Sequence, residues 1–378
     1  MKPTITYSLF LSILILIGCY SGKKALEKGN YDTAAFQAIN RLKSNPDHKK
    51  SRQTLKSAYF LAVDLHKDNI QRAKTSTDPT KYEQMVYDYQ AINNLYDAIA
   101  RCPGCREVVP RPERYDSELA GAKSKAAEYR YSLGEEALQQ KQNREKAKEA
   151  HGHFVQASEL VPRYKDVEEK IDEALFYATL KVVVEPIPSP VRIFDIKHEF
   201  FVNKINEYLH NNIINPYVRF YTPSEAKIEK LPFVDQIIEM EFDRFNLGGI
   251  SSRTYEKETS KDSVEVGKTK EGEAVFGTVK AVLKVNERSL TGSGLLDFKV
   301  KDSNTKKVLT QEKFPSEYVW TARWASFNGD ERALSEEEMN LVNTVEVSAP
   351  GPQVMFEEFT APLYDQVISK IRDYYRYF

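Results

Sequence analysis

Two of the three cysteines in the chain lie three positions apart, in the stretch CPGC at residues 102–105. Two thiols at this spacing can form a redox centre, half of a metal site or a structural disulfide. A redox centre needs its nucleophilic cysteine at a helix N-terminus, where the helix dipole stabilises the thiolate. Here a helix is predicted to end near Ala100, just before the cysteines, and no βαβ pattern surrounds them. Zinc needs four ligands, and all six histidines lie elsewhere in the chain.

The proline and glycine between the two cysteines favour a disulfide. Pro-Gly is the preferred central pair of a type II turn, which brings its first and last Cα atoms within about 7 Å. That separation suits a disulfide between Cys102 and Cys105. Closing so short a loop adds only about 2 kcal/mol of stability on the chain-entropy model. We predict a structural role, with no catalytic and no metal-binding function; a thiol-disulfide enzyme is the alternative.

The third cysteine, Cys19, ends an N-terminal stretch in which a lysine precedes a short apolar run, residues 9–17. About ten apolar residues make the core of a signal peptide and are too few to span a bilayer. The stretch LIGC at residues 16–19 resembles the bacterial lipobox. The resemblance implies that residues 1–18 are a lipoprotein signal peptide, that Cys19 carries palmitate-type acyl chains, and that residues 19–24 form a lipidated tether. An ordinary secretory signal with an incidental cysteine is the alternative.

The residues after Cys19 bear on the location of the lipid anchor. Tyr20 replaces the aspartate of the common inner-membrane retention signal, and Lys23 and Lys24 stand where surface-exported lipoproteins carry an acidic cluster. The lipobox resemblance therefore implies the inner leaflet of the outer membrane, facing the periplasm, with the surface leaflet left open. The periplasm is oxidising enough to keep a disulfide.

The composition of the chain limits its partners and its architecture. Charged residues make up 29% and the net charge is −1, so nucleic acid is excluded as a partner. The 378 residues suit two or three domains. Residues 25–178 are rich in Ala, Lys, Glu and Gln with helical periodicity, whereas residues 179–378 alternate Val, Ile, Phe and Thr between Pro and Gly. We predict an α+β multidomain fold, with a helical domain followed by a mixed α/β domain that has a largely antiparallel sheet.

Small residues recur in the helical half at positions that let antiparallel helices approach closely. The two copies are Ala25, Gly29, Tyr31, Ala34, Ala38 and Pro46, and then Tyr131, Gly134, Ala137, Ala150, Phe154, Ala157 and Pro162. They resemble degenerate tetratricopeptide repeats, which implies a helical scaffold for protein contacts. A generic helical bundle is the alternative. Between the copies, the apolar and aromatic stripe from Tyr82 to Ile99 is predicted to be the buried face of a helix.

The second half is predicted to run strand, helix, strand, helix, several antiparallel strands and a closing helix. Its stretches VDQIIEMEFDRF (234–245), TVKAVLKVNERS (278–289) and GLLDFKVKDSNTKKVLTQEKF (294–314) resemble the periplasmic domain of the CsgG, LpoB and TolB N-terminal group. The resemblance implies a non-enzymatic domain that docks onto envelope proteins or assembles into rings. The helical half departs from CsgG, which puts a pore in doubt. Charges on both faces of residues 251–279 also predict a solvated hairpin or loop rather than lipid-facing strands.

Both tryptophans of the chain lie in one stretch that is suited to binding a partner. In a strand, Tyr318, Trp320 and Trp324 would share one face, while Arg323 and Phe327 take the other. Aromatic rings with an interleaved arginine are the usual composition of an interface hot spot, so Trp320, Arg323, Trp324 and Phe327 form the candidate interaction surface. The alternative is that these rings close the core beside the last helix.

The sequence contains no recognisable catalytic constellation, phosphate-binding glycine loop or metal-spaced histidine pair. Gly248, Gly249 and the GSG of residues 292–294 are predicted to be turn glycines. We expect no enzyme, no metal and no cofactor, but a lipid-anchored periplasmic scaffold or adaptor in envelope assembly, secretion or cell-wall control, with envelope proteins and the membrane as partners. The alternatives are a ring-forming, homo-oligomeric secretion subunit and a thiol-disulfide or hydrolytic enzyme. As a whole, the chain resembles uncharacterised outer-membrane lipoproteins of Bacteroidota.

Overall fold

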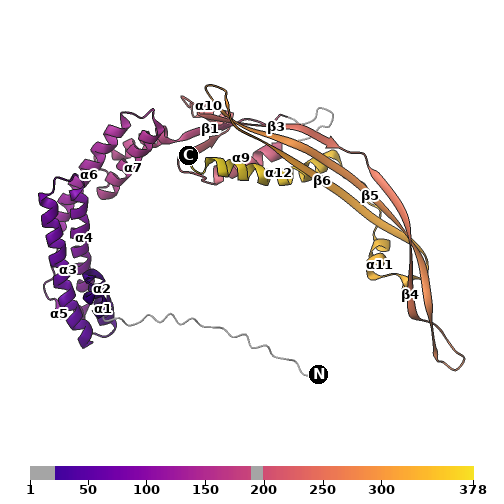
Figure 1. The fold of residues 1–378 in the computed structure, drawn as a ribbon, viewed down its shortest axis with the longest axis horizontal. Helices are drawn as coiled ribbons and strands as arrows, with labels where there is room; N and C mark the ends of the chain where they lie inside the picture. Colours follow the sequence, from indigo (N-terminus) through magenta and orange to yellow (C-terminus); the bar gives the residue numbers. More distant parts are fainter. Residues whose placement is uncertain (1–21, 189–198) are drawn as a thin grey trace. The chain divides into compact units, whose positions relative to one another are not determined.

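The computed structural model describes residues 22–188 and 199–378. The chain divides between Ala178 and Thr179 into a helical unit and a unit built on one six-stranded sheet (Figure 1). The predicted fold class, helices first and then a mixed domain with a mostly antiparallel sheet, is confirmed.

The helical unit follows the apolar periodicity of its sequence. It contains α1 (Lys23–Glu27), α2 (Tyr31–Ser44), α3 (Lys49–Thr75), α4 (Lys81–Ala100), α5 (Pro103–Val108), α6 (Asp116–Leu138), α7 (Arg144–Leu160) and α8 (Val167–Ala178). Met85, Tyr89, Ile92 and Ile99 are buried, so the stripe on α4 is the buried face of its helix, as predicted.

Small residues pack the helices of this unit closely. Ala34 and Ala38 of α2 and Ala58 of α3 are fully buried in one cluster. Between α6 and α7, a Cβ at Gly134 would lie 2.7 Å from the ring of Phe154, so only glycine lets the ring pack against α6. The buried alanines and Gly134 among the positions that resemble tetratricopeptide repeats therefore lie between packed helices, whereas Gly29, Pro46 and Pro162 are exposed.

The first helix overlaps the tether expected over residues 19–24, because Lys23 and Lys24 belong to α1. Gly22 precedes them at φ +77°, in the left-handed region that favours glycine. It is buried against α2, since a Cβ at this position would overlap the backbone of Ala34. The helical unit is thus packed from Gly22 onward.

The second unit is a mixed sheet with helices on it. Its elements are β1 (Leu180–Val184), α9 (Glu199–Asn211), β2 (Val218–Tyr221), α10 (Pro223–Ile228), β3 (Gln236–Leu247), β4 (Ser251–Lys268), β5 (Ala274–Asp302), β6 (Val308–Gly329), the 3-10 helix η1 (Glu331–Ala333), α11 (Glu336–Asn343) and α12 (Pro352–Tyr375). The strand order is β2-β1-β3-β5-β4, with β6 also paired to β5. β1 is parallel to β2 and β3, and the other pairs are antiparallel.

The main core of this unit lies between the sheet and the helices α9 and α12 (Figure 1). Burial alternates along β3, as expected of a strand with one covered face. Phe242 and Phe245 of β3 meet Phe356 and Phe359 of α12, with ring centroids between 5.2 and 6.3 Å apart. This aromatic cluster attaches α12 to the sheet.

The GSG at residues 292–294 lies inside β5, which corrects the prediction of a turn. β5 runs unbroken for 29 residues through the position of the predicted turn. Gly294 serves close packing instead. A Cβ at Gly294 would lie 2.8 Å from the ring of Phe359 and would overlap the carbonyl group of Arg244, next to a bulge in β3.

Strands β4, β5 and β6 continue beyond the part of the sheet that α12 covers (Figure 1). Gly248 and Gly249 connect β3 to β4, as predicted. β4 is exposed along almost its whole length and pairs with β5, so residues 251–279 form a hairpin rather than a loop. A second, smaller core lies under α11 and η1 and includes Leu283, Val285 and Leu334.

Candidate functional site

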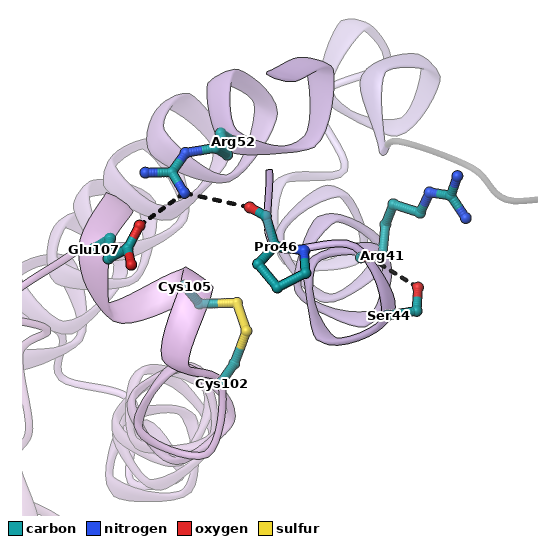
Figure 2. Close-up of a disulfide and its surroundings, with 7 residues drawn as sticks. All are labelled: Arg41, Ser44, Pro46, Arg52, Cys102, Cys105 and Glu107. Carbon is teal, nitrogen blue, oxygen red and sulfur yellow. Dashed lines mark hydrogen bonds and ion pairs between the residues drawn. A yellow bond between two sulfur atoms is a disulfide. The ribbon is translucent and has the colours of Figure 1, made fainter. Parts of the chain in front are cut away.

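The cysteine pair is joined in the structure and lies inside the helical unit. Cys102 and Cys105 form a disulfide with a Cα–Cα separation of 5.1 Å, and both residues are fully buried (Figure 2). The disulfide holds the corner where α4 ends and α5 begins. A Cβ at Gly104 would lie only 2.9 Å from Cβ of Pro46, so the α2–α3 loop packs directly on this corner.

The backbone at this corner differs from the predicted type II turn. Cys102 is the N-cap of α5 and Pro103 is its first residue, because proline suits a position where no N–H is needed. The helix continues to Val108 and ends before Pro110. Cys102 therefore lies at a helix N-terminus, and the argument from helix polarity against redox chemistry is wrong. Redox chemistry is instead disfavoured by the burial of both cysteines, because thiol exchange needs access to a sulfur atom.

Arg52 of α3 ties this corner to its neighbours. Its Nη1 donates to Oε2 of Glu107 in α5 at 2.9 Å and to the carbonyl oxygen of Pro46 at 3.3 Å (Figure 2). The disulfide, Arg52 and the α2–α3 loop thus hold one end of the helical unit together. This arrangement supports a structural disulfide.

The tryptophans lie on the same face of β6 as the main core, farther along the strand. Tyr318, Trp320 and Trp324 pair with Gly292, Leu290 and Asn286 of β5, respectively. Tyr318 packs against the main core. Trp320 and Trp324 follow on the same face and are partly exposed. The two tryptophan rings therefore lie beyond the main core, on the face of the sheet that α12 covers, and do not close the core beside α12.

Arg323 and Phe327 lie on the opposite face of β6, so the structure does not bring the four predicted surface residues together. Phe327 packs against the smaller core under α11. Arg323 is exposed, and its Nε donates to Oε2 of Glu287 at 2.6 Å. Alternation along a strand separates them from the tryptophans, and the predicted surface is reduced to Trp320 and Trp324.

Arg288 of β5 completes this surface and was missed from the sequence. Its guanidinium carbon lies 5.1 Å from the centroid of the Trp324 ring, within cation–π range. Its Nη1 also pairs with Oε1 of Glu346 at 2.6 Å. We call Arg288, Trp320 and Trp324 the tryptophan face. Only the β5–β6 register brings Arg288 beside the rings, so no local sequence pattern indicates it.

A buried histidine between two carboxylates is the second feature missed from the sequence. Nδ1 of His66 in α3 lies 2.7 Å from Oδ1 of Asp88 in α4, and its Nε2 lies 3.0 Å from Oδ2 of Asp32 in α2. Asp88 also accepts from Asn69 at 3.1 Å and from Gln84 at 2.9 Å. Burial lowers the pKa of His66, but the hydrogen bonds and charges of the two carboxylates outweigh it, and the pKa is raised. Both ring nitrogens are hydrogen-bonded to carboxylates, so His66 joins the three helices α2, α3 and α4.

The remaining predicted site residue, Cys19, lies outside the described residues. Across 22–188 and 199–378, no group of three or more His, Cys, Asp and Glu side chains is placed to hold a metal ion. Within the same ranges, none of the helices combines the length and the apolar character needed to cross a bilayer.

Comparisons with known proteins do not assign the chain to a family. No family model matches it, and no curated protein matches it. Among solved structures, it is similar to a neuraminyllactose-binding hemagglutinin homolog from Helicobacter pylori, with a TM-score of 0.23 and 10% identity over 52% of this chain and 84% of that chain. A TM-score this low carries no argument about fold or function.

Proposed function

We propose that the chain is a non-catalytic scaffold or adaptor that is anchored to the outer membrane through acylated Cys19, faces the periplasm and binds envelope proteins. The observation that carries this proposal is the tryptophan face. Trp320 and Trp324 are partly exposed on one face of a sheet, next to a guanidinium group. Tryptophan and arginine are the residues most enriched in the hot spots of protein interfaces.

The surroundings of the tryptophan face also support a binding role. The face continues along strands whose other positions are largely exposed. A neighbouring segment, residues 344–351, contributes Glu346 to Arg288, which holds the guanidinium in place beside the ring. A fixed arginine loses less conformational freedom when a partner binds.

The proposal is tested by site-specific photo-crosslinking in native envelopes. A crosslinking residue at Trp324 should capture a defined envelope protein. The same residue at Val319, which is exposed on the other face of β6, is the matched control. Equal capture at both positions, or none at either, would contradict a specific binding surface.

The lipid anchor is tested separately by metabolic labelling with palmitate. The wild-type chain should incorporate label and fractionate with the outer membrane. Cys19→Ser should lose both the label and the membrane association. A wild-type chain that takes up no label would remove the anchor from the proposal.

A ring-forming secretion subunit is the second candidate. It is favoured by the outer edges of β4 and β6, each of which pairs only with β5 among the described strands. Unpaired edges are the usual sites at which strands from another chain add. Charged residues along β4 and Pro315 in β6 oppose such pairing. A large symmetric assembly in detergent would favour this candidate over the scaffold. A thiol-disulfide enzyme has less support, because both cysteines are buried.

A further inference from the structure

The packed part of the helical unit begins at Gly22, only three residues after Cys19. Gly22 is buried on α2, where a Cβ would overlap the backbone of Ala34. Its carbonyl oxygen also accepts from the N–H of Leu26 at 3.0 Å, which begins α1. Gly22 therefore belongs to the packed body of the unit.

The chain between Cys19 and Gly22 is too short to act as a spacer. Only Tyr20 and Ser21 lie between them. Successive Cα atoms are about 3.8 Å apart, so the Cα of Cys19 lies within about 11 Å of the Cα of Gly22 in any conformation. That limit is about the diameter of one helix with its side chains, roughly 10–12 Å. Acyl chains on Cys19 would therefore hold the helical unit at the bilayer surface.

The residues around Gly22 have the charge that such a surface attracts. Residues 23–28 contain three lysines and one glutamate, while the whole chain has a net charge of −1. Lys23 pairs with Glu27, with 3.5 Å between Nζ and Oε1. Lys24 and Lys28 are exposed and have no ion pair within the described part of the chain. Lysines within a Debye length of anionic lipid are attracted to it.

We propose that α1 is a membrane-contact surface that lies on anionic phospholipid headgroups and holds the helical unit against the bilayer. The inference rests on the proposed acylation of Cys19 and goes beyond it, because an acylated cysteine with a long linker would leave the protein free above the membrane. Because α1 would lie on the bilayer, the end of the helical unit that contains α1 would be unavailable to protein partners.

The test uses the full acylated chain in vesicles of phosphatidylcholine and phosphatidylglycerol that contain a headgroup-attached fluorescence quencher. A fluorophore is placed at Lys28→Cys and, as the control, at Gln142→Cys in the exposed turn between α6 and α7. The native Cys102 and Cys105 are buried and disulfide-bonded, so they do not compete for label. The Lys28 substitution removes one of the charges and so biases the test against the proposal.

We expect quenching at position 28 to be several-fold greater than at position 142, and to fall when phosphatidylglycerol is left out. Equal quenching at the two positions in palmitate-labelled protein would overturn the contact and leave the lipid anchor standing. Quenching at position 28 that does not depend on phosphatidylglycerol would overturn the role of the lysines. A chain that takes up no palmitate would overturn both the anchor and the contact.

Discussion

Nδ1 of His66 and Oδ1 of Asp88 lie 2.7 Å apart inside the helical unit, and both side chains are almost completely buried. Nε2 of the same ring faces Asp32 at 3.0 Å. A neutral imidazole has one N–H and can donate to only one of the two carboxylates, whereas the imidazolium donates to both. The site therefore favours the charged ring, in agreement with the raised pKa of His66.

We expect the helical unit to lose stability as the pH rises. Because the pKa of His66 is raised on folding, its contribution is fully present below the unfolded pKa, about 6.5, and is lost as the pH rises through the folded value. Urea unfolding followed by far-ultraviolet circular dichroism should show a lower midpoint above the folded pKa than below it.

His66→Gln should remove this pH dependence and cost roughly 3–5 kcal/mol, because Asp88 would remain buried without its charged partner. His210→Gln is the control, since the ring of His210 is 39% exposed and pairs with Glu225 at the surface. A wild-type midpoint that does not change over this pH range would contradict the assignment.

The disulfide should stabilise the helical unit without conferring activity. We expect the double variant Cys102→Ala, Cys105→Ala to lose about 2 kcal/mol in its free energy of unfolding, the value for so short a loop. Under native conditions the buried wild-type disulfide should react slowly with a soluble reductant. Disulfide-exchange activity that is present in the wild type and lost in the double variant would contradict the structural role.

Gly292 and Gly294 of β5 should respond differently to the same substitution. Gly294→Ala places a methyl group 2.8 Å from the Phe359 ring and against the Arg244 carbonyl, which should cost about 1–3 kcal/mol or more. Gly292→Ala is the matched control, because its Cβ would meet nothing closer than Cε of Met355 at 3.5 Å. Thermal unfolding of both variants checks the prediction, and equal losses would show that the close approach at Gly294 is not limiting.

Loss of the Trp324 ring should weaken partner binding more than it weakens the fold. For a hot-spot tryptophan, Trp324→Ala should reduce the affinity for the crosslinked partner by about 2 kcal/mol or more, roughly thirtyfold. Arg288→Ala should have a smaller effect, and Val319→Ala on the other face should have none. Titration of the purified partner, with circular dichroism as the folding control, measures these differences. An unchanged affinity for Trp324→Ala would remove the tryptophan face from the interface.

The sequence by itself determined the features that depend on neighbouring residues. Apolar periodicity predicts the helices of the first unit, and the change of composition near residue 178 coincides with the division of the structure between Ala178 and Thr179. Burial along α4 also follows directly from its stripe. These properties arise within one or two turns of chain, so a local pattern is enough to predict them.

The tertiary structure decided everything that depends on residues far apart in the chain. The β5–β6 register places Arg288 beside Trp324 and leaves Arg323 on the opposite face. Residues 292–294 are strand rather than turn because they pair with β3 on one side and with β6 on the other. Gly294 is needed there to accommodate Arg244 and Phe359, which lie on two other elements. A glycine is compatible with a turn and with a close approach alike, and only its spatial neighbours distinguish the two. Strand register and helix packing are set by the whole buried surface, which no short stretch of sequence contains.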